Sequence, residues 1–279
     1  MTTFDARRTP MNGRVAAEHL ADHAQDRPLV TGTPAQVSVP VADLLRRPNG
    51  PRDRQLLLGD TVTLYETRAG WCFVQADKDG YVGYLSATQI AQVPDTATHW
   101  VNAPASHAYQ EANFKSPDCL ALSFGSRVTV QEIAGRFAKT NLGFIPMQHL
   151  RRLDDLASDP VDVAQQFLGT PYLWGGNSRW GIDCSGLVQA AYLACGRPCP
   201  GDSDQQEAEV RQAYLPNDGY RRGDLLFWKG HVALVVDADR LIHANVHHMA
   251  VAFEEIDAAI ARIAEQGDGP VTAHRRPAP

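Results

Sequence analysis

Three residues in the second half of the chain have the types and spacing that nucleophilic catalysis requires. Cys184 lies at the first turn of a helix predicted over Ser185–Cys195, where the helix N-terminus supplies partial positive charge and N–H donors. This position lowers the pKa of a thiol and favours the nucleophilic thiolate. His231 opens the apolar segment HVALVVDA, and His243 lies in the next one, RLIHAN. On neighbouring antiparallel strands, one imidazole accepts the thiol proton and the other fixes its tautomer.

Each of these residues also has a structural interpretation. A free cysteine is commonly a small buried hydrophobe, and a single histidine near a strand is commonly structural. The order of Cys184, His231 and His243, each in a separate helix or strand, favours the catalytic interpretation. The glycines in PYLWGGNSRWGIDC allow the backbone to approach a ligand closely just before the thiol.

Apolar periodicity predicts the elements that position these residues. VDVAQQFLG has a helical face, with Asp159 as N-cap and Gly169 as C-cap, and SGLVQAAYLACG predicts a second helix that ends at Gly196. Four segments typical of strands follow, DLLFW, HVALVVDA, RLIHAN and MAVAFE, before a last helical segment, EIDAAIARIAEQG. Helices followed by an antiparallel sheet predict an α+β domain, which we assign to residues 154–279.

The first half of the chain predicts β structure with an internal repeat. Residues 1–34 form an N-terminal arm with one short amphipathic helix. LLLGDTVTLYETRAGWCFVQADKDGYVGYL then resembles LALSFGSRVTVQEIAGRFAKTNLGFIPMQHL, with Gly59 and Gly125 in corresponding positions. Both segments consist of short runs rich in Val, Leu, Tyr and Phe, separated by turn residues. We therefore predict two copies of a small β module, at residues 35–95 and 96–153.

Several blocks in the second half match one family in order and spacing. PYLWGG, DCSGLV, RRGDLLFW, GHVALVV and LIHA resemble the NlpC/P60 cysteine peptidases, from about residue 156 to 275. The β repeats resemble the bacterial SH3-like modules that precede this domain in the family. The resemblance implies an α+β fold class, with a papain-like NlpC/P60 catalytic domain preceded by two small all-β SH3-like barrels. The arrangement is similar to the γ-D-glutamyl-L-diamino acid endopeptidases, also called dipeptidyl-peptidase VI.

The resemblance also implies roles for individual residues. Cys184 corresponds to the nucleophile, His231 to the base and His243 to the orienting third member of the triad. The residues that correspond to the substrate pocket are Tyr172 near the oxyanion, Trp174 on the wall, Asp183, Ser185, Ser203 and Tyr81.

Asp183, Ser185 and Ser203 correspond to residues that bind the free N-terminal amine of the substrate, and a cationic amine needs such a carboxylate and hydroxyls. Tyr81 is the candidate through which the first SH3-like module closes the pocket, although a tyrosine in the core of a strand is an equal alternative. Gly201 departs from the family, which often has Arg at this position. This difference leaves only the local conformation of that loop unpredicted.

The function that the resemblance implies is hydrolysis of the γ-D-glutamyl–diamino acid bond in cell-wall peptides with a free N-terminal L-Ala, for murein peptide recycling. The expected partner is the peptide L-Ala-γ-D-Glu-diamino acid. Two alternatives stay open: a papain-like amidase or acyltransferase with another acyl substrate, and a wall-binding scaffold protein. The set of Cys184, His231 and His243 argues against the scaffold. The preferred diamino acid, the length of the stem peptide and the oligomeric state stay open.

Composition and short motifs exclude several other classes of protein and of binding site. Lys plus Arg number 26 against 32 Asp plus Glu, so no global positive charge attracts nucleic acid or an anionic membrane. The sequence shows no targeting segment and no membrane span, which predicts a cytoplasmic location. Five cysteines without a signal argue against a disulfide framework. No phosphate-binding glycine loop occurs, and Cys195 and Cys199 lack converging partners, so we expect no cofactor and no metal.

Overall fold

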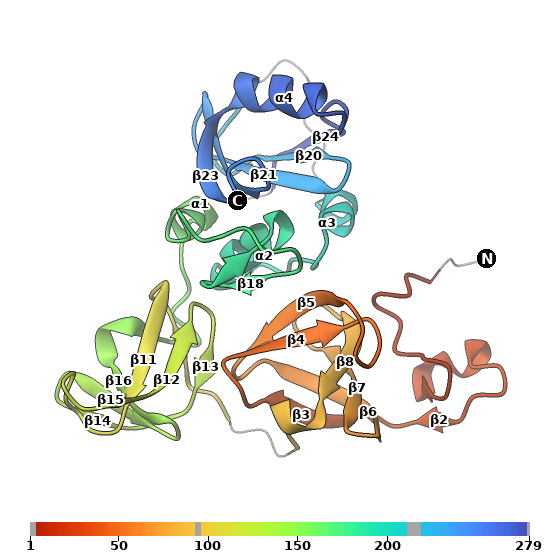
Figure 1. The fold of residues 1–279 in the computed structure, drawn as a ribbon, viewed down its shortest axis with the longest axis vertical. Coiled ribbons are helices and arrows are strands. Elements are labelled where there is room, and N and C mark those ends of the chain that lie inside the picture. The colour runs from red at the N-terminus through yellow and green to blue at the C-terminus, as the bar shows by residue number, and fades with distance from the viewer. Residues whose placement is uncertain (1–3, 93–95, 211–218, 278–279) are drawn as a thin grey trace. The chain divides into compact units, whose positions relative to one another are not determined.

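The chain folds as two units, Met1–Asp154 and Asp155–Pro279, which are described separately (Figure 1). The computed structural model describes residues 4–92, 96–210 and 219–277. The arm at the start of the first unit contains two parallel strands, β1 (Ala16–Ala17) and β2 (Leu29–Val30). Between them lies a 3-10 helix, η1 (Glu18–His23), instead of the predicted amphipathic α-helix. Leu20 interrupts η1 with non-helical φ and ψ, because so short a segment gains little from α-helical hydrogen bonds.

A seven-stranded antiparallel sheet follows the arm, in the order β5-β4-β8-β7-β6-β3-β9. Its strands are β3 (Thr33–Val37), β4 (Val41–Leu45), β5 (Arg52–Leu57), β6 (Thr61–Arg68), β7 (Trp71–Ala76), β8 (Val82–Ser86) and β9 (Ile90–Ala91), with the 3-10 helix η2 (Ala87–Gln89) before the last. Alternate residues along β4 and β8 are buried, which is the period-2 pattern of a sheet with one face on a core. Leu44, Val62, Val74 and Leu85 meet in that core.

The second half of this unit is another small β structure. Its strands form two sheets, in the orders β13-β10-β17 and β12-β11-β16-β15-β14. They are β10 (His99–Val101), β11 (Ala105–Tyr109), β12 (Asp118–Ser123), β13 (Arg127–Val128), β14 (Val130–Ala134), β15 (Phe137–Thr140), β16 (Gly143–Pro146) and β17 (Leu150–Arg152), with the 3-10 helix η3 (Met147–His149) before the last. Val101, Ala108, Leu122 and Ile145 are fully buried at its centre.

The same glycine turn occurs in both halves of the first unit, at the positions that the repeat predicts. Gly59 has φ 81° and Gly125 has φ 86°, a left-handed conformation that side chains with a Cβ rarely adopt. The Gly59 N–H donates to the Val37 carbonyl at 2.9 Å, and the Gly125 N–H donates to the Val101 carbonyl at 2.9 Å. Each turn therefore ties the end of one strand to an earlier strand in the same way, which supports a duplicated module.

The second unit contains a five-stranded antiparallel sheet in the order β23-β22-β21-β20-β24. Its elements are α1 (Pro160–Gln165), β18 (Asn177–Ser178), β19 (Gly181–Ile182), α2 (Cys184–Ala194), α3 (Ser203–Glu209), β20 (Leu225–Trp228), β21 (His231–Val235), β22 (Arg240–Asn245), β23 (Ala250–Glu255), α4 (Ile256–Glu265) and β24 (Ala273–Arg275). The predicted helices and the four predicted strands are present, and Asp159 caps α1 as expected, but the C-cap of α1 is Gln166 and not Gly169. The α+β prediction for this half of the chain is confirmed.

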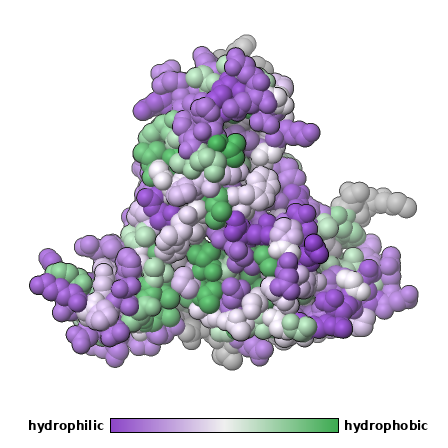
Figure 2. Space-filling model, viewed as in Figure 1, coloured by the Kyte–Doolittle hydropathy of each residue, from purple (hydrophilic) through white to green (hydrophobic). Residues whose placement is uncertain are grey.

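Helix α4 packs on the sheet through one apolar stripe. Ile256, Ala259 and Ile263 are buried at helical spacing and join the core with Leu241 and Trp228. The surface over α4 is mostly hydrophilic in Figure 2, as expected for the opposite side of an amphipathic helix. Among the residues that the structure describes, none of the helices has the length and apolar character needed to span a membrane.

Candidate active site

Cys184 is the first residue of α2, and the local sequence places it there. Asp183 is the N-cap, with extended backbone, and its Oδ1 accepts from the Gly186 N–H at 2.6 Å. Cys184 is 6% exposed, and its Sγ lies 4.0 Å from the Gly230 carbonyl oxygen. The thiol therefore lies at the positive end of the helix and beside the residue that precedes His231.

The glycines before the thiol are required by close packing. A Cβ on Gly176 would lie 2.5 Å from the Gly181 carbonyl oxygen, and a Cβ on Gly186 would lie 2.5 Å from the Gly176 carbonyl oxygen. This close approach lets the Gly175 N–H donate to Asp183 Oδ2 at 2.9 Å. Both carboxylate oxygens of Asp183 thus hold backbone on either side of Cys184.

The two histidines of the predicted triad form a hydrogen-bonded pair. His231 begins β21, and His243 lies within β22, which pairs antiparallel with β21 through Leu234 and Ile242. His231 Nε2 lies 2.9 Å from His243 Nδ1, and His243 is 1% exposed. The structure therefore brings the side chains of His231 and His243 together on one face of the sheet.

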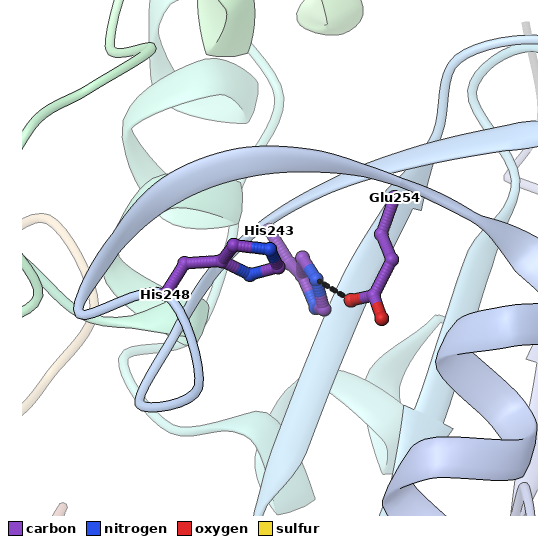
Figure 3. Close-up of side chains that lie close together, drawn as sticks. All are labelled: His243, His248 and Glu254. Carbon is purple, nitrogen blue, oxygen red and sulfur yellow. Dashed lines mark hydrogen bonds and ion pairs between the residues drawn. The ribbon is translucent and has the colours of Figure 1, made fainter.

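A carboxylate and a guanidinium extend this pair. His243 Nε2 lies 3.0 Å from Glu254 Oε2 of β23. Figure 3 marks this contact with a dashed line. Arg262 of α4 donates from Nε to Glu254 Oε1 at 2.8 Å and from Nη2 to Glu254 Oε2 at 2.7 Å. A continuous row of polar contacts therefore runs from His231 through His243 and Glu254 to Arg262.

The surroundings of this row set its charges. Burial lowers the pKa of His231, and the nearby His243 and Arg262 lower it further. Burial also lowers the pKa of His243, although the hydrogen bond to Glu254 opposes the shift. For Glu254, burial acts to raise the pKa, but hydrogen bonds from Arg262 and His243 outweigh it and hold the pKa below its ordinary value. The row therefore consists of two neutral imidazoles, His231 and His243, followed by the ionised carboxylate of Glu254.

Three more of the predicted site residues lie in or near the first turn of α2, namely Tyr172, Ser185 and Ser203. Tyr172 forms a bridge with Ile182, and burial, with smaller effects of Cys184 and Asp183, raises the pKa of its phenol. The phenol thus stays protonated and can donate. The Ser185 hydroxyl donates to Asp183 Oδ1 at 3.2 Å, and Ser203 begins α3.

Helix α3 is tied to the start of α2 by one side chain. Gln206 Nε2 donates to the Ser185 carbonyl oxygen at 2.9 Å and to the Pro200 carbonyl oxygen at 2.9 Å. Because Gln206 is fully buried, these two bonds fix the position of the helix that Ser203 begins.

Trp174 and Tyr81 differ sharply in exposure. Trp174, on the loop before β18, is 69% exposed. Tyr81 is 4% exposed and packs in the core of the first barrel with Leu44 and Leu85. Its backbone N–H donates to Asp79 Oδ1 at 3.0 Å. The role of Tyr81 in closing a pocket stays a prediction.

His248 lies near His243 and Glu254 (Figure 3), and one potential ligand atom from each residue falls within 4.8 Å of the others. Such a group is a candidate for a metal ion. Arg262, however, donates to both Glu254 oxygens, and its positive charge opposes a cation in the same space. His248 is also held by Asn245, whose Oδ1 accepts from the His248 backbone N–H at 2.8 Å. The arrangement suits hydrogen bonding better than metal binding.

Comparison with known protein families finds a match in part of each unit. The model described as NlpC/P60 family matches residues 169–263, and the one described as bacterial dipeptidyl-peptidase Sh3 domain matches residues 44–90. The chain is 27% identical over 216 residues to gamma-D-glutamyl-L-lysine dipeptidyl-peptidase of Bacillus subtilis (strain 168), covering 68% of this chain and 71% of that protein. The chain carries an NlpC/P60 domain. A bacterial dipeptidyl-peptidase SH3 domain precedes the NlpC/P60 domain within the chain.

Further relatives agree with this assignment. The chain is 38% identical over 98 residues to dipeptidyl-peptidase 6 of Lysinibacillus sphaericus, a match that covers 35% of each chain. A crystal structure of an NlpC/P60 family protein from Bacillus cereus ATCC 10987 matches 88% of this chain and 100% of that one, with a TM-score of 0.73 and 20% identity. The predicted NlpC/P60 domain and the predicted fold class are confirmed, and this domain supports a cysteine peptidase.

Sequence reasoning missed two residues of the NlpC/P60 domain, Glu254 and Arg262. Glu254 was inside a predicted strand, but its place beside His243 depends on the register of β22 and β23, in which Leu241 pairs with Glu254. Arg262 reaches the carboxylate from α4. Side chains alternate along a strand, so Glu254, two residues after the His243 partner Ala252, lies on the same face as His243, but only a known register shows this.

Proposed function

We propose that the chain is a cysteine endopeptidase that hydrolyses the γ-D-glutamyl–diamino acid bond of cell-wall peptides with a free N-terminal L-Ala. The observation that carries this proposal is the hydrogen-bonded pair of His231 and His243, placed next to the residue whose carbonyl contacts Cys184 Sγ. The named relatives support the choice of bond, since two of them are gamma-D-glutamyl-L-lysine dipeptidyl-peptidases.

The proposed reaction is acyl transfer through a thioester. His231 accepts the thiol proton, and Cys184 Sγ attacks the γ-carbonyl carbon of D-Glu. The N–H groups at the start of α2, with the Tyr172 phenol, stabilise the oxyanion. The proton on His231 passes to the leaving amine of the diamino acid. Water then loses a proton to His231, attacks the thioester and releases L-Ala-γ-D-Glu with the thiol restored.

The proposed anchor for the substrate amine is Asp183, supported by Ser185 and Ser203. The carboxylate is buried and already accepts from two backbone N–H groups and the Ser185 hydroxyl, so the substrate ammonium would join donors at a fixed acceptor. A charge-assisted contact of this kind contributes about 1.5–3 kcal/mol. We therefore expect peptides with a blocked amine to be poor substrates. The expected cytoplasmic location stays a prediction alongside this proposal.

The test compares L-Ala-γ-D-Glu-L-Lys and L-Ala-γ-D-Glu-meso-diaminopimelate with their N-acetyl forms, with mass spectrometry of the products. We expect L-Ala-γ-D-Glu from the free peptides and, for the acetylated ones, a fall in kcat/KM of about tenfold to a hundredfold or more. The Cys184→Ala protein is the control for contaminating peptidase activity. Equal cleavage of the blocked peptides would remove Asp183 as the amine anchor. Absence of cleavage, with transfer or hydrolysis of another acyl group, would favour the amidase or acyltransferase alternative.

A further inference from the structure

The row of contacts from Arg262 to His231 ends at the base of the proposed reaction. We propose that Glu254, held by Arg262, is a positioning residue that sets the tautomers of both His243 and His231 and leaves the lone pair of His231 on Nδ1. The proposal rests on the proposed function for the identity of the reaction that this base serves. It follows from three contacts, taken in order from the carboxylate.

The first contact fixes a hydrogen on His243 Nε2. Arg262 donates to both oxygens of Glu254, at 2.8 Å and 2.7 Å, so the carboxylate stays ionised and acts only as an acceptor. His243 Nε2 lies 3.0 Å from Glu254 Oε2. A lone pair on this nitrogen would face a negative oxygen, whereas an N–H donates to it. His243 therefore carries its hydrogen on Nε2.

The second contact transfers this choice to His231. His243 is buried and neutral, and with its hydrogen on Nε2 its Nδ1 is an acceptor. That nitrogen lies 2.9 Å from His231 Nε2. His231 Nε2 must therefore carry the hydrogen and donate it, since two lone pairs would repel each other at this distance.

The third step leaves a single basic atom. A neutral imidazole has one N–H and one lone pair, so His231 with its hydrogen on Nε2 has the lone pair on Nδ1. Nδ1 is the nitrogen that His243 does not contact, and His231 directly follows Gly230, whose carbonyl oxygen lies 4.0 Å from Cys184 Sγ. The carboxylate thus determines, through two rings, which nitrogen is available to the thiol.

The opposite arrangement shows what Glu254 prevents. If His243 carried its hydrogen on Nδ1, it would donate to His231 Nε2 and leave the His231 hydrogen on Nδ1. His231 would then present an N–H where the reaction needs a lone pair. This inactive arrangement reverses the hydrogen bond between the two imidazoles and places a lone pair of His243 Nε2 against the Glu254 carboxylate, which cannot donate. The acceptor at the end of the row therefore decides between the two arrangements.

The experiment uses ¹⁵N-histidine NMR, which distinguishes protonated from unprotonated ring nitrogens. Spectra are recorded in a Cys184→Ala background, because the alanine cannot exchange a proton with His231. We expect both His231 and His243 to carry their hydrogen on Nε2, and Glu254→Gln to shift both toward Nδ1–H, because the amide can donate to His243. Glu254→Asp keeps an ionised acceptor and should keep the Nε2–H tautomers. Glu255→Gln, at the exposed neighbouring carboxylate, is the matched control.

Kinetics on the protein with Cys184 intact give the second measurement. Glu254→Gln should lower kcat on L-Ala-γ-D-Glu-L-Lys by about a hundredfold with little change in KM, while Glu254→Asp should retain much more activity. The Glu254→Gln substitution should also slow alkylation of Cys184 by iodoacetamide, a reaction that needs no peptide substrate. A neutral His231 with its hydrogen on Nδ1 in the otherwise native protein would overturn the proposal, even if Glu254→Gln does not fold. So would unchanged tautomers in a folded Glu254→Gln protein.

These measurements separate the inference from the proposed function. If the peptide is not cleaved, but the tautomers and the alkylation of Cys184 respond to Glu254→Gln as expected, the substrate assignment fails and the positioning role of Glu254 stands. If the peptide is cleaved but the tautomers do not respond, the peptidase stands and Glu254 has a structural role only.

Discussion

A histidine, a carboxylate and an arginine meet at both edges of the five-stranded sheet, with different surroundings. Each group joins a histidine Nε2 to a carboxylate that also accepts two bonds from an arginine. The groups are His243, Glu254 and Arg262 at the β23 edge, and His274, Asp224 and Arg276 at the β24 edge. The residue types alone therefore do not distinguish a reactive group from a structural one.

The neighbours of each carboxylate make the difference. Beyond Glu254, His243 contacts a second imidazole, His231, and the row continues toward the thiol. Asp224 instead also accepts from the Arg221 backbone N–H at 2.9 Å, and its other partners lie on or just after β24. Burial acts to raise the pKa of Asp224, but hydrogen bonds from its partners hold it below the ordinary value. The first group relays a tautomer, while the second joins a turn to the last strand.

The largest expected effect is loss of activity on substituting His231. His231→Ala should lower kcat/KM by about ten-thousandfold, as severely as Cys184→Ala, because members of a catalytic triad act as a unit. His274→Ala, at the other edge, should leave the activity of the folded protein unchanged. Rates on L-Ala-γ-D-Glu-L-Lys test both variants. A similar loss for His274→Ala would erase the distinction between the two edges.

The next effect is on stability at the second edge. Asp224→Ala removes a buried acceptor from the partly buried side chains of His274 and Arg276, and should lower the free energy of unfolding by about 1–3 kcal/mol. Urea unfolding measures the loss. The control is Asp154→Ala, at the exposed ion pair with Arg152, for which we expect a change in the free energy of unfolding within about 0.5 kcal/mol. Activity per folded molecule should survive in Asp224→Ala. A stable but inactive protein would contradict the structural role.

A smaller effect is expected at His243, because it acts through another residue. His243→Ala should cost less activity than His231→Ala, and His243→Gln less again, since a glutamine oxygen can accept the His231 N–H. We expect a loss of about tenfold to a hundredfold for His243→Gln. Equal losses for His243→Gln and His231→Ala would contradict the orienting role. Measurement of kcat and KM separately shows whether the loss lies in the chemical step.

The smallest effect concerns the dependence of stability on pH. His243 has a lowered pKa in the folded protein, so below its ordinary value of 6.5 the unfolded chain takes up a proton that the folded one does not. Stability should therefore fall as pH decreases below 6.5, until the folded pKa is reached, by at most about 1.4 kcal/mol per pH unit for this group. His243→Asn should reduce the slope of unfolding free energy against pH. An unchanged slope in that variant would contradict this account.

The sequence predicted those parts of the site that local patterns determine. The helix that begins at Cys184 and the strands of His231 and His243 follow from apolar periodicity and from short motifs. The boundaries of α2, Cys184–Ala194, differ by one residue from the prediction. The dual hydrogen bonding of Asp183 was missed, although an Asp directly before an apolar helical segment is a standard N-cap signal.

The parts that sequence could not give depend on contacts between distant elements. Glu254 meets His243 through a strand register, and Arg262 meets Glu254 from a helix that follows the sheet. No local sequence pattern predicts either contact, because core packing determines the strand register and the position of the helix. The arm helix was wrong for the opposite reason: residues 15–24 have a helical pattern, but most of the chain there forms β1 and a short 3-10 helix.

The pairing of β24 with β20 has a consequence for the order of folding. Strands β20 to β23 are joined by short connections, so they can pair early, at small cost in chain entropy. Strand β24 pairs with β20 across nearly fifty intervening residues, through Leu225 and Arg275, and we expect it to join after the transition state. Contacts formed that late mainly slow unfolding. The Asp224 group should therefore govern how long a folded molecule lasts more than how fast it forms.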